Sequence, residues 1–255
     1  TLAGTGERDY YGDGLAGDLA AFNRPAGVAF SLERLPVRLS DNPLIVDEAG
    51  LRSTTFPRYA YVADTGNHVV RRIELDGEIG CCNRDGELDV YMNEVGRHLV
   101  TTVIGTGQPG INTWRSQADA FQLDSPAGIA ALSNGNILVS DTKNHRIVEY
   151  NPETGVVTTL LGKVIEAAGE YFSEPGHTNG ASANHPLNQS ADPETPPANT
   201  VRMNSPHALT ALPMQTIDAT GTGDIVFFAD RGNQRARVYL AGDFNAAGTN
   251  LGELV

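Results

Sequence analysis

Short apolar runs, each closed by a turn rich in Gly, Pro, Asn or Asp, recur along the chain and predict β-strands rather than long helices. In each unit a proline stands at the start of the first strand, where its missing N–H costs least. A second apolar strand leads into an Asp-x-x-Asn turn, whose side chains can bond the nearby backbone. A third strand follows, and then a Thr-rich strand that suits a half-exposed edge. Four antiparallel strands of this kind predict a β-propeller blade.

Three such units can be aligned along the chain. The first contains Pro25–Ala29, Ala63–His68 and Val100–Gly105, the second Pro126–Ala130, Ser140–His145 and Val157–Gly162, and the third Pro206–Leu209 and Ala229–Gln234. The third unit departs from the others, because it has Gln234 where they have histidine and Pro-His-Ala where they have Pro-Ala-Gly. The proline and the turn aspartate are 39, 15 and 24 residues apart in the three units, so only the second is close to a bare blade.

The run Ala63–His68 resembles the signature of NHL repeats, as do Leu2–Gly6 and Gly12–Gly14 with the Pro25–Ala29 segment that follows them. The resemblance covers about half of the chain and implies an all-β propeller of four-stranded antiparallel blades. We expect a single domain over residues 1–255 with repeats at about 1–107, 108–162 and 163–255. Long insertions are expected at 31–58, 76–98 and 163–203, and loops of that length often carry function.

Three blades are too few for a ring, since propellers usually have four to eight. Thr1–Gly6 aligns with Thr102–Gly107, and Leu254 and Val255 align with Leu99 and Val100, so the chain starts and stops inside the same strand of the repeat. The propeller is therefore either partial or completed by another chain or segment. Three alternatives follow: a segment of a longer propeller, two chains joined as three plus three blades, or a degenerate blade hidden in the insertions. Each leaves a β-edge to be covered, which predicts a protein partner or self-association.

Charge narrows the range of partners. The formal net charge is −13 and the pI about 4.8, which disfavours phosphate backbones and anionic membranes. Some NHL domains bind RNA, but this charge argues against nucleic acid here. No apolar stretch is long enough for a membrane-spanning helix, so no membrane insertion is expected.

The candidate site residues are mainly the polar residues that recur in every unit. We predict a structural role in the repeat for Asp64, Asn67, His68, Asp141, Asn144, His145, Asp230 and Asn233. An Asp–Arg contact is expected from Arg71, Arg146 and Arg235, which follow the turns. The adjacent Cys81 and Cys82 are free thiols, a strained vicinal disulfide or links to other chains, because neighbouring Cα atoms are too close for an ordinary bridge.

Two metal sites can be considered. NHL-type lyases that act on peptide amides hold zinc through histidines inside the propeller, but the equivalents of His207 are Ala26 and Ala127, which breaks that pattern. The acidic, Gly-rich run Tyr11–Asp18 could bind calcium through its carboxylates, but it lacks the ligand spacing of an EF-hand loop. We therefore predict no metal and no cofactor, with calcium as the one open alternative.

No catalytic residues are predicted, since the chain has neither a G-x-S-x-G elbow nor a phosphate-binding P-loop. The prediction is a non-enzymatic binding or scaffold module; the alternative is a metal-dependent propeller enzyme of lyase or lactonase type. Extracellular or periplasmic location is expected from the few lysines, the sequon at Asn188–Ser190 and a start that is not Met.

Overall fold

The computed structural model describes residues 2–37, 54–75, 98–176, 202–215 and 222–242. Blade 1 consists of β1 (Pro25–Phe30), β4 (Tyr59–Asp64), β5 (Val69–Glu74) and β6 (Val100–Ile104), hydrogen-bonded in that order. Every pairing in the blade is antiparallel. The predicted four-stranded antiparallel blade is thus confirmed.

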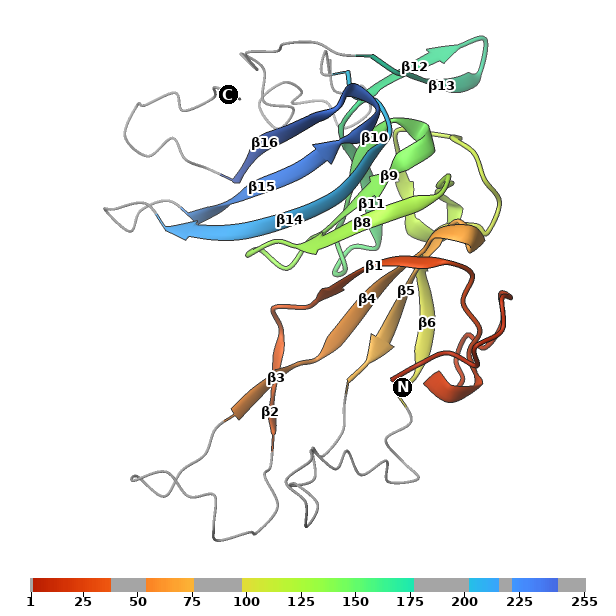
Figure 1. Ribbon diagram of the computed structural model, residues 1–255, viewed down its shortest axis with the longest axis vertical. Coiled ribbons are helices and arrows are strands. Elements are labelled where there is room, and N and C mark those ends of the chain that lie inside the picture. Colours follow the sequence, from red (N-terminus) through yellow and green to blue (C-terminus); the bar gives the residue numbers. More distant parts are fainter. Residues whose placement is uncertain (1, 38–53, 76–97, 177–201, 216–221, 243–255) are drawn as a thin grey trace, which may run out of the picture.

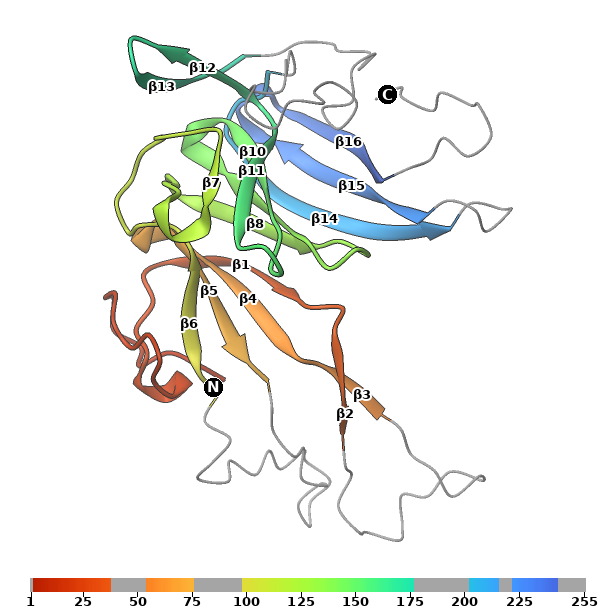
Figure 2. The ribbon, with the colours of Figure 1, turned by 180° about the vertical axis from the view of Figure 1, so that it is seen from behind.

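Blade 2 has the same core of β8 (Pro126–Ala131), β9 (Ile137–Asp141), β10 (Arg146–Tyr150) and β11 (Val156–Leu161). A short extra strand, β7 (Arg115–Gln117), pairs with the outer strand β11 (Figure 2). Blade 3 is formed in the described residues by β14 (Pro206–Gln215), β15 (Thr222–Asp230) and β16 (Arg235–Gly242). The three innermost strands β1, β8 and β14 lie side by side (Figure 1).

Two antiparallel hairpins lie outside the blades in the part of the chain that the structure describes. The hairpin of β2 (Arg34–Val37) and β3 (Thr54–Pro57) separates the first two strands of blade 1 and explains the long interval from proline to aspartate there. The hairpin of β12 (Lys163–Ala167) and β13 (Glu170–Glu174) lies between blades 2 and 3 in the chain. In the described part of blade 3 the longer interval is taken up by longer strands, β14 and β15. The two hairpins project from opposite ends of the molecule (Figure 1).

Apolar side chains fill the space between successive blades, which is the main source of stability in this arrangement. The core between blades 1 and 2 includes Tyr61, Val70, Phe121, Ile129 and Val148. The core between blades 2 and 3 includes Leu132, Leu138, Ile147, Val226 and Phe228. A third, smaller core on the other side of blade 1 is covered by Ala20, Phe22 and Ala3 of the N-terminal segment.

Glycine allows the innermost strands to approach so closely. A Cβ added to Gly27 would lie 2.3 Å from the carbonyl oxygen of Ala127, and one added to Gly128 would lie 2.0 Å from that of His207. Neither distance is possible for real atoms, so any larger residue would separate the blades. The Pro-Ala-Gly motif therefore has a packing reason for its glycine.

Candidate functional site

The three Asp-x-x-Asn turns have the same internal hydrogen bonds. Each turn is one 3₁₀ turn between two strands: η3 (Thr65–Asn67), η5 (Thr142–Asn144) and η7 (Arg231–Asn233). One carboxylate oxygen of the aspartate accepts the N–H two residues before the blade's proline, at 2.7 Å for Asp64, Asp141 and Asp230 alike. The other oxygen accepts the amide of the turn asparagine at 2.8, 2.8 and 2.9 Å.

The turn asparagines also tie in the chain that precedes each blade. The amides of Asn67, Asn144 and Asn233 donate a second hydrogen bond to the carbonyls of Asp9, Gly110 and Gly176. Both side chains of each turn are thus engaged with protein groups in all three blades. Burial raises the pKa of Asp64 and Asp141, and these hydrogen bonds act in the opposite direction.

A buried arginine lies beside each turn, and the expected Asp–Arg contact is present for Arg71 and Arg146. Arg146 contacts Asp141 at 2.7 Å, as expected. Arg71 pairs with Asp13 at 2.7 Å, and in blade 3 Arg237 contacts Asp230 at 3.2 Å.

The three guanidinium groups nevertheless occupy the same place. Each donates to the carbonyl four residues before the blade's proline, which belongs to Ala21, Gln122 and Arg202 respectively. The guanidinium also lies over an aromatic ring, at 4.9 Å from Phe22 in blade 1 and 4.5 Å from Phe121 in blade 2. Arg71 and Arg237 are seven residues after the aspartate and Arg146 is five, so all three point to the same face of the strand. Strand periodicity is the signal that could have identified Arg237.

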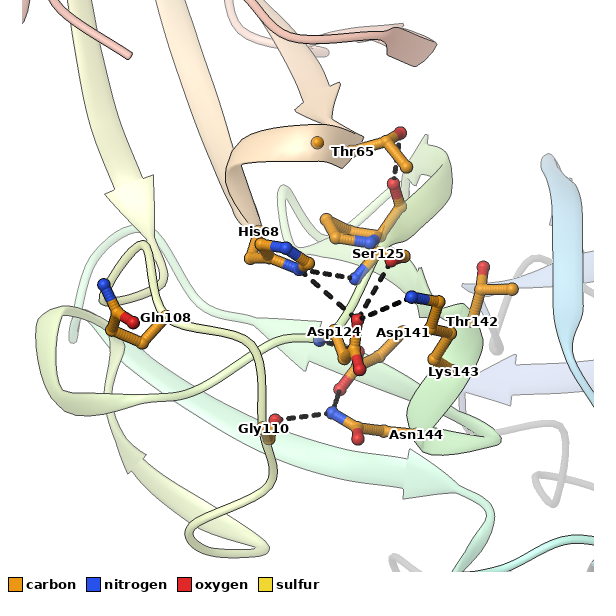
Figure 3. Close-up of polar contacts among 12 residues, drawn as sticks. Thr65, His68, Gln108, Gly110, Asp124, Ser125, Asp141, Thr142, Lys143 and Asn144 are labelled. Atoms are coloured by element: carbon orange, nitrogen blue, oxygen red, sulfur yellow. Dashed lines mark hydrogen bonds and ion pairs between the residues drawn. The ribbon is translucent and has the colours of Figure 1, made fainter. Parts of the chain in front are cut away.

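His68 and His145 close their turns and reach the next blade. Both have left-handed backbone, with φ of 57° and 51°. Nδ1 of His68 accepts the N–H of Ser125 at 3.1 Å (Figure 3), and Nδ1 of His145 accepts the N–H of Ser205 at 3.0 Å. Burial lowers the pKa of His145, which favours the neutral ring that this acceptor role requires.

Threonine provides a second hydrogen bond between blades. The hydroxyl of Thr65 donates to the carbonyl of Pro126 at 2.6 Å, and that of Thr142 to the carbonyl of Pro206 at 2.7 Å. At both interfaces the turn therefore holds the start of the next blade by the same pair of contacts. Blade 3 has Arg231 and Gln234 at these positions.

Ser125, His68 and Asp124 lie together at the first interface, which resembles a catalytic arrangement only in composition (Figure 3). The Ser125 hydroxyl donates to Asp124 at 2.9 Å, whereas Nδ1 of His68 is occupied by the Ser125 N–H. A nucleophile would need its hydroxyl hydrogen-bonded to the histidine. At the second interface Asn204 replaces Asp124 and the histidine contact is kept. This geometry does not provide an activated serine.

Metal-ligating side chains are dispersed in the part of the chain that the structure describes, where no group of three or more His, Cys, Asp or Glu converges. Asp13, in the acidic Gly-rich run, binds Arg71 and the N–H of Thr102. His98 is buried with Nδ1 against the carbonyl of Glu74, and His207 lies on the innermost strand β14. Outside the described residues lie His177, His185, Cys81, Cys82 and the sequon at Asn188.

No helix in the described residues is long and apolar enough to cross a membrane.

Comparison with known proteins identifies the repeat. Residues 123–150, which run from the loop before blade 2 to the end of β10, match the model of the NHL repeat. No curated protein matches the sequence.

Among solved structures, the chain is similar to an auxiliary nutrient binding protein from Bacteroides thetaiotaomicron, with 16% identity, a TM-score of 0.41, and 77% of this chain and 42% of the other covered. A protein of the same description from Bacteroides ovatus has 15% identity and a TM-score of 0.43, with 88% of this chain and 50% of the other covered. A protein of unknown function from B. thetaiotaomicron has 13% identity and a TM-score of 0.43, with 86% and 47% covered. The chain thus spans half or less of the length of these structures, and similarity at this level supports no functional argument.

Proposed function

Since this chain is an NHL-repeat protein, we propose that it is a non-enzymatic binding or scaffold module. One observation carries the proposal: the recurring polar residues of the turns make hydrogen bonds within each blade and, in blades 1 and 2, to the blade that follows. The turn aspartates and asparagines bind the chain before each blade, and the histidines of blades 1 and 2 bind the blade that follows. These hydrogen bonds give the recurring polar groups a structural use that needs neither a metal nor a substrate.

The contact surface is proposed to lie on the segments that interrupt the repeat, because such segments often carry binding function on a rigid scaffold. The β12–β13 hairpin is the best-defined example. At its base the Glu174 carboxylate binds Lys163 of the same hairpin and Arg202 outside it, each at 2.6 Å. The same hairpin exposes Phe172, an aromatic side chain 48% accessible to solvent. An exposed aromatic side chain on a hairpin outside the blades is a suitable anchor for a partner.

The proposed partner is a protein or a neutral or cationic ligand rather than a nucleic acid, because the chain has a formal charge of −13. An extracellular or periplasmic setting is proposed on the scarcity of lysine and on the sequon. Detection of an N-linked glycan at Asn188 in protein from its natural source would support this setting, and recovery only from cytosol would contradict it.

The test separates binding from catalysis. Freshly purified protein would be assayed for zinc and calcium and for hydrolysis of 4-nitrophenyl acetate and dihydrocoumarin, with each metal added in turn. We expect less than about one tenth of an equivalent of metal and no saturable turnover. Stoichiometric zinc or calcium, or turnover that a single point variant abolishes, would establish the metal-dependent lyase or lactonase alternative.

The binding arm uses arrays of immobilised peptides and glycans. Phe172→Asp is expected to remove the array signal of the wild-type protein. Leu19→Asp is the matched control, because Leu19 is also 48% exposed but lies in η1 (Gly17–Leu19) on the N-terminal segment. Signal lost in the Leu19 variant and kept in the Phe172 variant would refute the assignment of the hairpin.

A further inference from the structure

The hairpin of β12 and β13 is closed by a two-residue loop, which determines where its backbone groups point. Both residues of the loop Ala168–Gly169 have left-handed backbone, with φ of 56° and 82°, as in the tightest β-hairpin turns. The flanking residues Ala167 and Glu170 face each other in the register and form the hydrogen-bonded pair that closes such a loop. Hydrogen-bonded and non-hydrogen-bonded pairs then alternate along the strands. In β13 the N–H and C=O groups of Tyr171 and Ser173 therefore point away from β12.

The outer edge of β13 is unpaired in the part of the chain that the structure describes. The hairpin is a sheet of two strands, and neither Tyr171 nor Ser173 makes a backbone hydrogen bond to another described element. Many proteins protect such an edge with a bulge, a proline or a lysine. The register of β13 has no bulge, and the strand contains neither proline nor lysine. This edge can therefore accept a further strand.

One face of β13 carries the side chains that would select the added strand. Residues 170, 172 and 174 share this face, because side chains alternate along a strand. Phe172 is the exposed aromatic side chain of the hairpin. Glu174 is already bound to Lys163 and Arg202, whereas Glu170 is exposed and no cation contacts it among the described residues. The face thus offers one apolar side chain and, two residues before it, one carboxylate without a cationic partner.

Register and charge together define the complementary strand. An antiparallel strand on this edge places one residue opposite Phe172 in a non-hydrogen-bonded pair, where side chains come closest. An apolar residue at that position packs on the Phe172 ring. The residue two positions later lies opposite Glu170, where a lysine or arginine forms a cross-strand ion pair. The residue between them donates its N–H to the Tyr171 carbonyl.

Two other arrangements fit these groups less well. Two copies of the chain, joined antiparallel about Phe172 of β13, would place Glu170 of one copy opposite Glu174 of the other, and like charges directly opposite each other destabilise a sheet. The outer edge of β12 has Ile165 and Ala167 where β13 has Phe172 and Glu170. That edge therefore offers neither the aromatic ring nor the carboxylate.

We propose that the outer edge of β13 binds an extended segment of a partner protein as a third, antiparallel strand. The segment has an apolar residue opposite Phe172 and, two positions later, a lysine or arginine opposite Glu170. This inference rests on the proposed function, because it specifies the partner that the hairpin holds. Backbone hydrogen bonds to Tyr171 and Ser173 provide affinity, and the two side chains provide specificity, as in other sheets that are extended by a peptide. The formal charge of −13 on the chain favours the same basic partner.

The test uses the wild-type chain and a fluorescein-labelled peptide, Thr-Thr-Phe-Thr-Lys-Thr-Thr, with binding followed by fluorescence anisotropy. A methyl group on the nitrogen of the threonine between phenylalanine and lysine removes the hydrogen bond to Tyr171. This change should weaken binding by at least about fivefold. The matched control carries the methyl group on the phenylalanine nitrogen, whose N–H points away from β13. It should bind as the parent peptide does.

Charge reversal tests the register. A second peptide has glutamate in place of the lysine, and the wild-type chain should bind it more weakly than the parent by roughly two- to fivefold, the effect of one exposed ion pair. The variant Glu170→Lys should reverse this preference. Glu153→Lys is the matched control, because Glu153 is also exposed but lies before the start of β11, whereas the hairpin follows the end of that strand. It should keep the wild-type preference.

The outcomes separate this inference from the proposed function. Equal binding of the two methylated peptides would overturn strand addition, even where Phe172→Asp removes the array signal and the hairpin stays the contact surface. The same holds if no peptide changes the anisotropy at about 1 mM protein while the array still gives a signal. A Glu170→Lys chain that is folded by circular dichroism and still prefers lysine would overturn the register. If the array gives no signal either, the proposed function falls together with this inference.

Discussion

Moving the arginine of β10 from position 146 to position 148 tests whether the stability of blade 2 depends on where the guanidinium lies in space rather than on its position in the sequence. Arg146 is fully buried and donates four hydrogen bonds: to Asp141, to the carbonyls of Thr113 and Gln122, and to the Thr159 hydroxyl. The variant Arg146→Val leaves the Asp141 carboxylate buried without its cation. Removing one partner of a buried ion pair costs about 3–5 kcal/mol.

The compensating change is Val148→Arg. The double variant then has valine at 146 and arginine at 148, as blade 1 has Val69 and Arg71 at the equivalent positions. Positions 146 and 148 share one face of the strand, and Arg237 reaches Asp230 from the position equivalent to 148. We therefore expect the double variant to recover at least half of the stability lost in Arg146→Val. Val148→Arg alone should destabilise, because it adds a second buried cation beside Arg146.

Urea unfolding of the four proteins, followed by the fluorescence of the single tryptophan Trp114, gives the coupling energy of this double-mutant cycle. The Trp114 carbonyl accepts the N–H of Thr159, so the probe lies at blade 2. A coupling energy near zero, with the double variant as unstable as the sum of the single variants, would refute the equivalence of the two positions.

Three further predictions concern the interfaces between blades. His145→Gln should reduce the loss of stability between pH 7 and 5. A histidine whose pKa is lowered in the folded state stabilises the protein fully above its unfolded pKa of 6.5, and that contribution is lost as the pH falls through the folded pKa. An unchanged slope of the unfolding free energy against pH would contradict this. Gly128→Ala should cost about 1–3 kcal/mol or more in urea titrations, because the new Cβ meets backbone of blade 3, and a loss below that range would show that the blades can part cheaply. Leu138→Ala should lower the free energy of unfolding by about 2–5 kcal/mol. Phe227→Ala at the equivalent position of blade 3 should lower it far less, because Phe227 is 40% exposed and Leu138 is 0% exposed. Similar melting temperatures for the two variants would mean that Phe227 is covered in solution.

The sequence contained enough information to predict the blades but not the way in which they contact one another. Strand order followed from local signals, because each proline, apolar run and Asp-x-x-Asn turn acts within a few residues. The contacts of His68 with Ser125 and of Thr65 with Pro126 join residues about 60 positions apart, and no spacing rule connects them. They become visible only when neighbouring blades are placed side by side.

The arginines show that distance from the turn along the sequence does not fix which residue places its guanidinium beside the turn. Arg235 follows its aspartate by five residues, as Arg146 does, yet the guanidinium that occupies the equivalent place beside Asp230 is that of Arg237. A guanidinium on a long flexible stem can reach one point from two positions that share a face, so selection for a buried cation does not fix the residue number. Arg71 extends this freedom, since its partner Asp13 lies in the connection before the blade rather than in the turn.

The same reasoning explains why the departures of blade 3 are informative. The histidine of the turn can be replaced by another residue only where no following blade depends on its geometry. In blade 3 the positions of the glycine, the threonine and the histidine all differ from those in blades 1 and 2. Their counterparts in blades 1 and 2 all contact the following blade, by a close backbone approach and two hydrogen bonds. Changes confined to one set of contacts indicate relaxation of that contact rather than decay of the repeat, since Asp230 and Asn233 keep the internal bonds of the turn. Blade 3 thus retains the interactions that form a blade and has lost those that bind the next one.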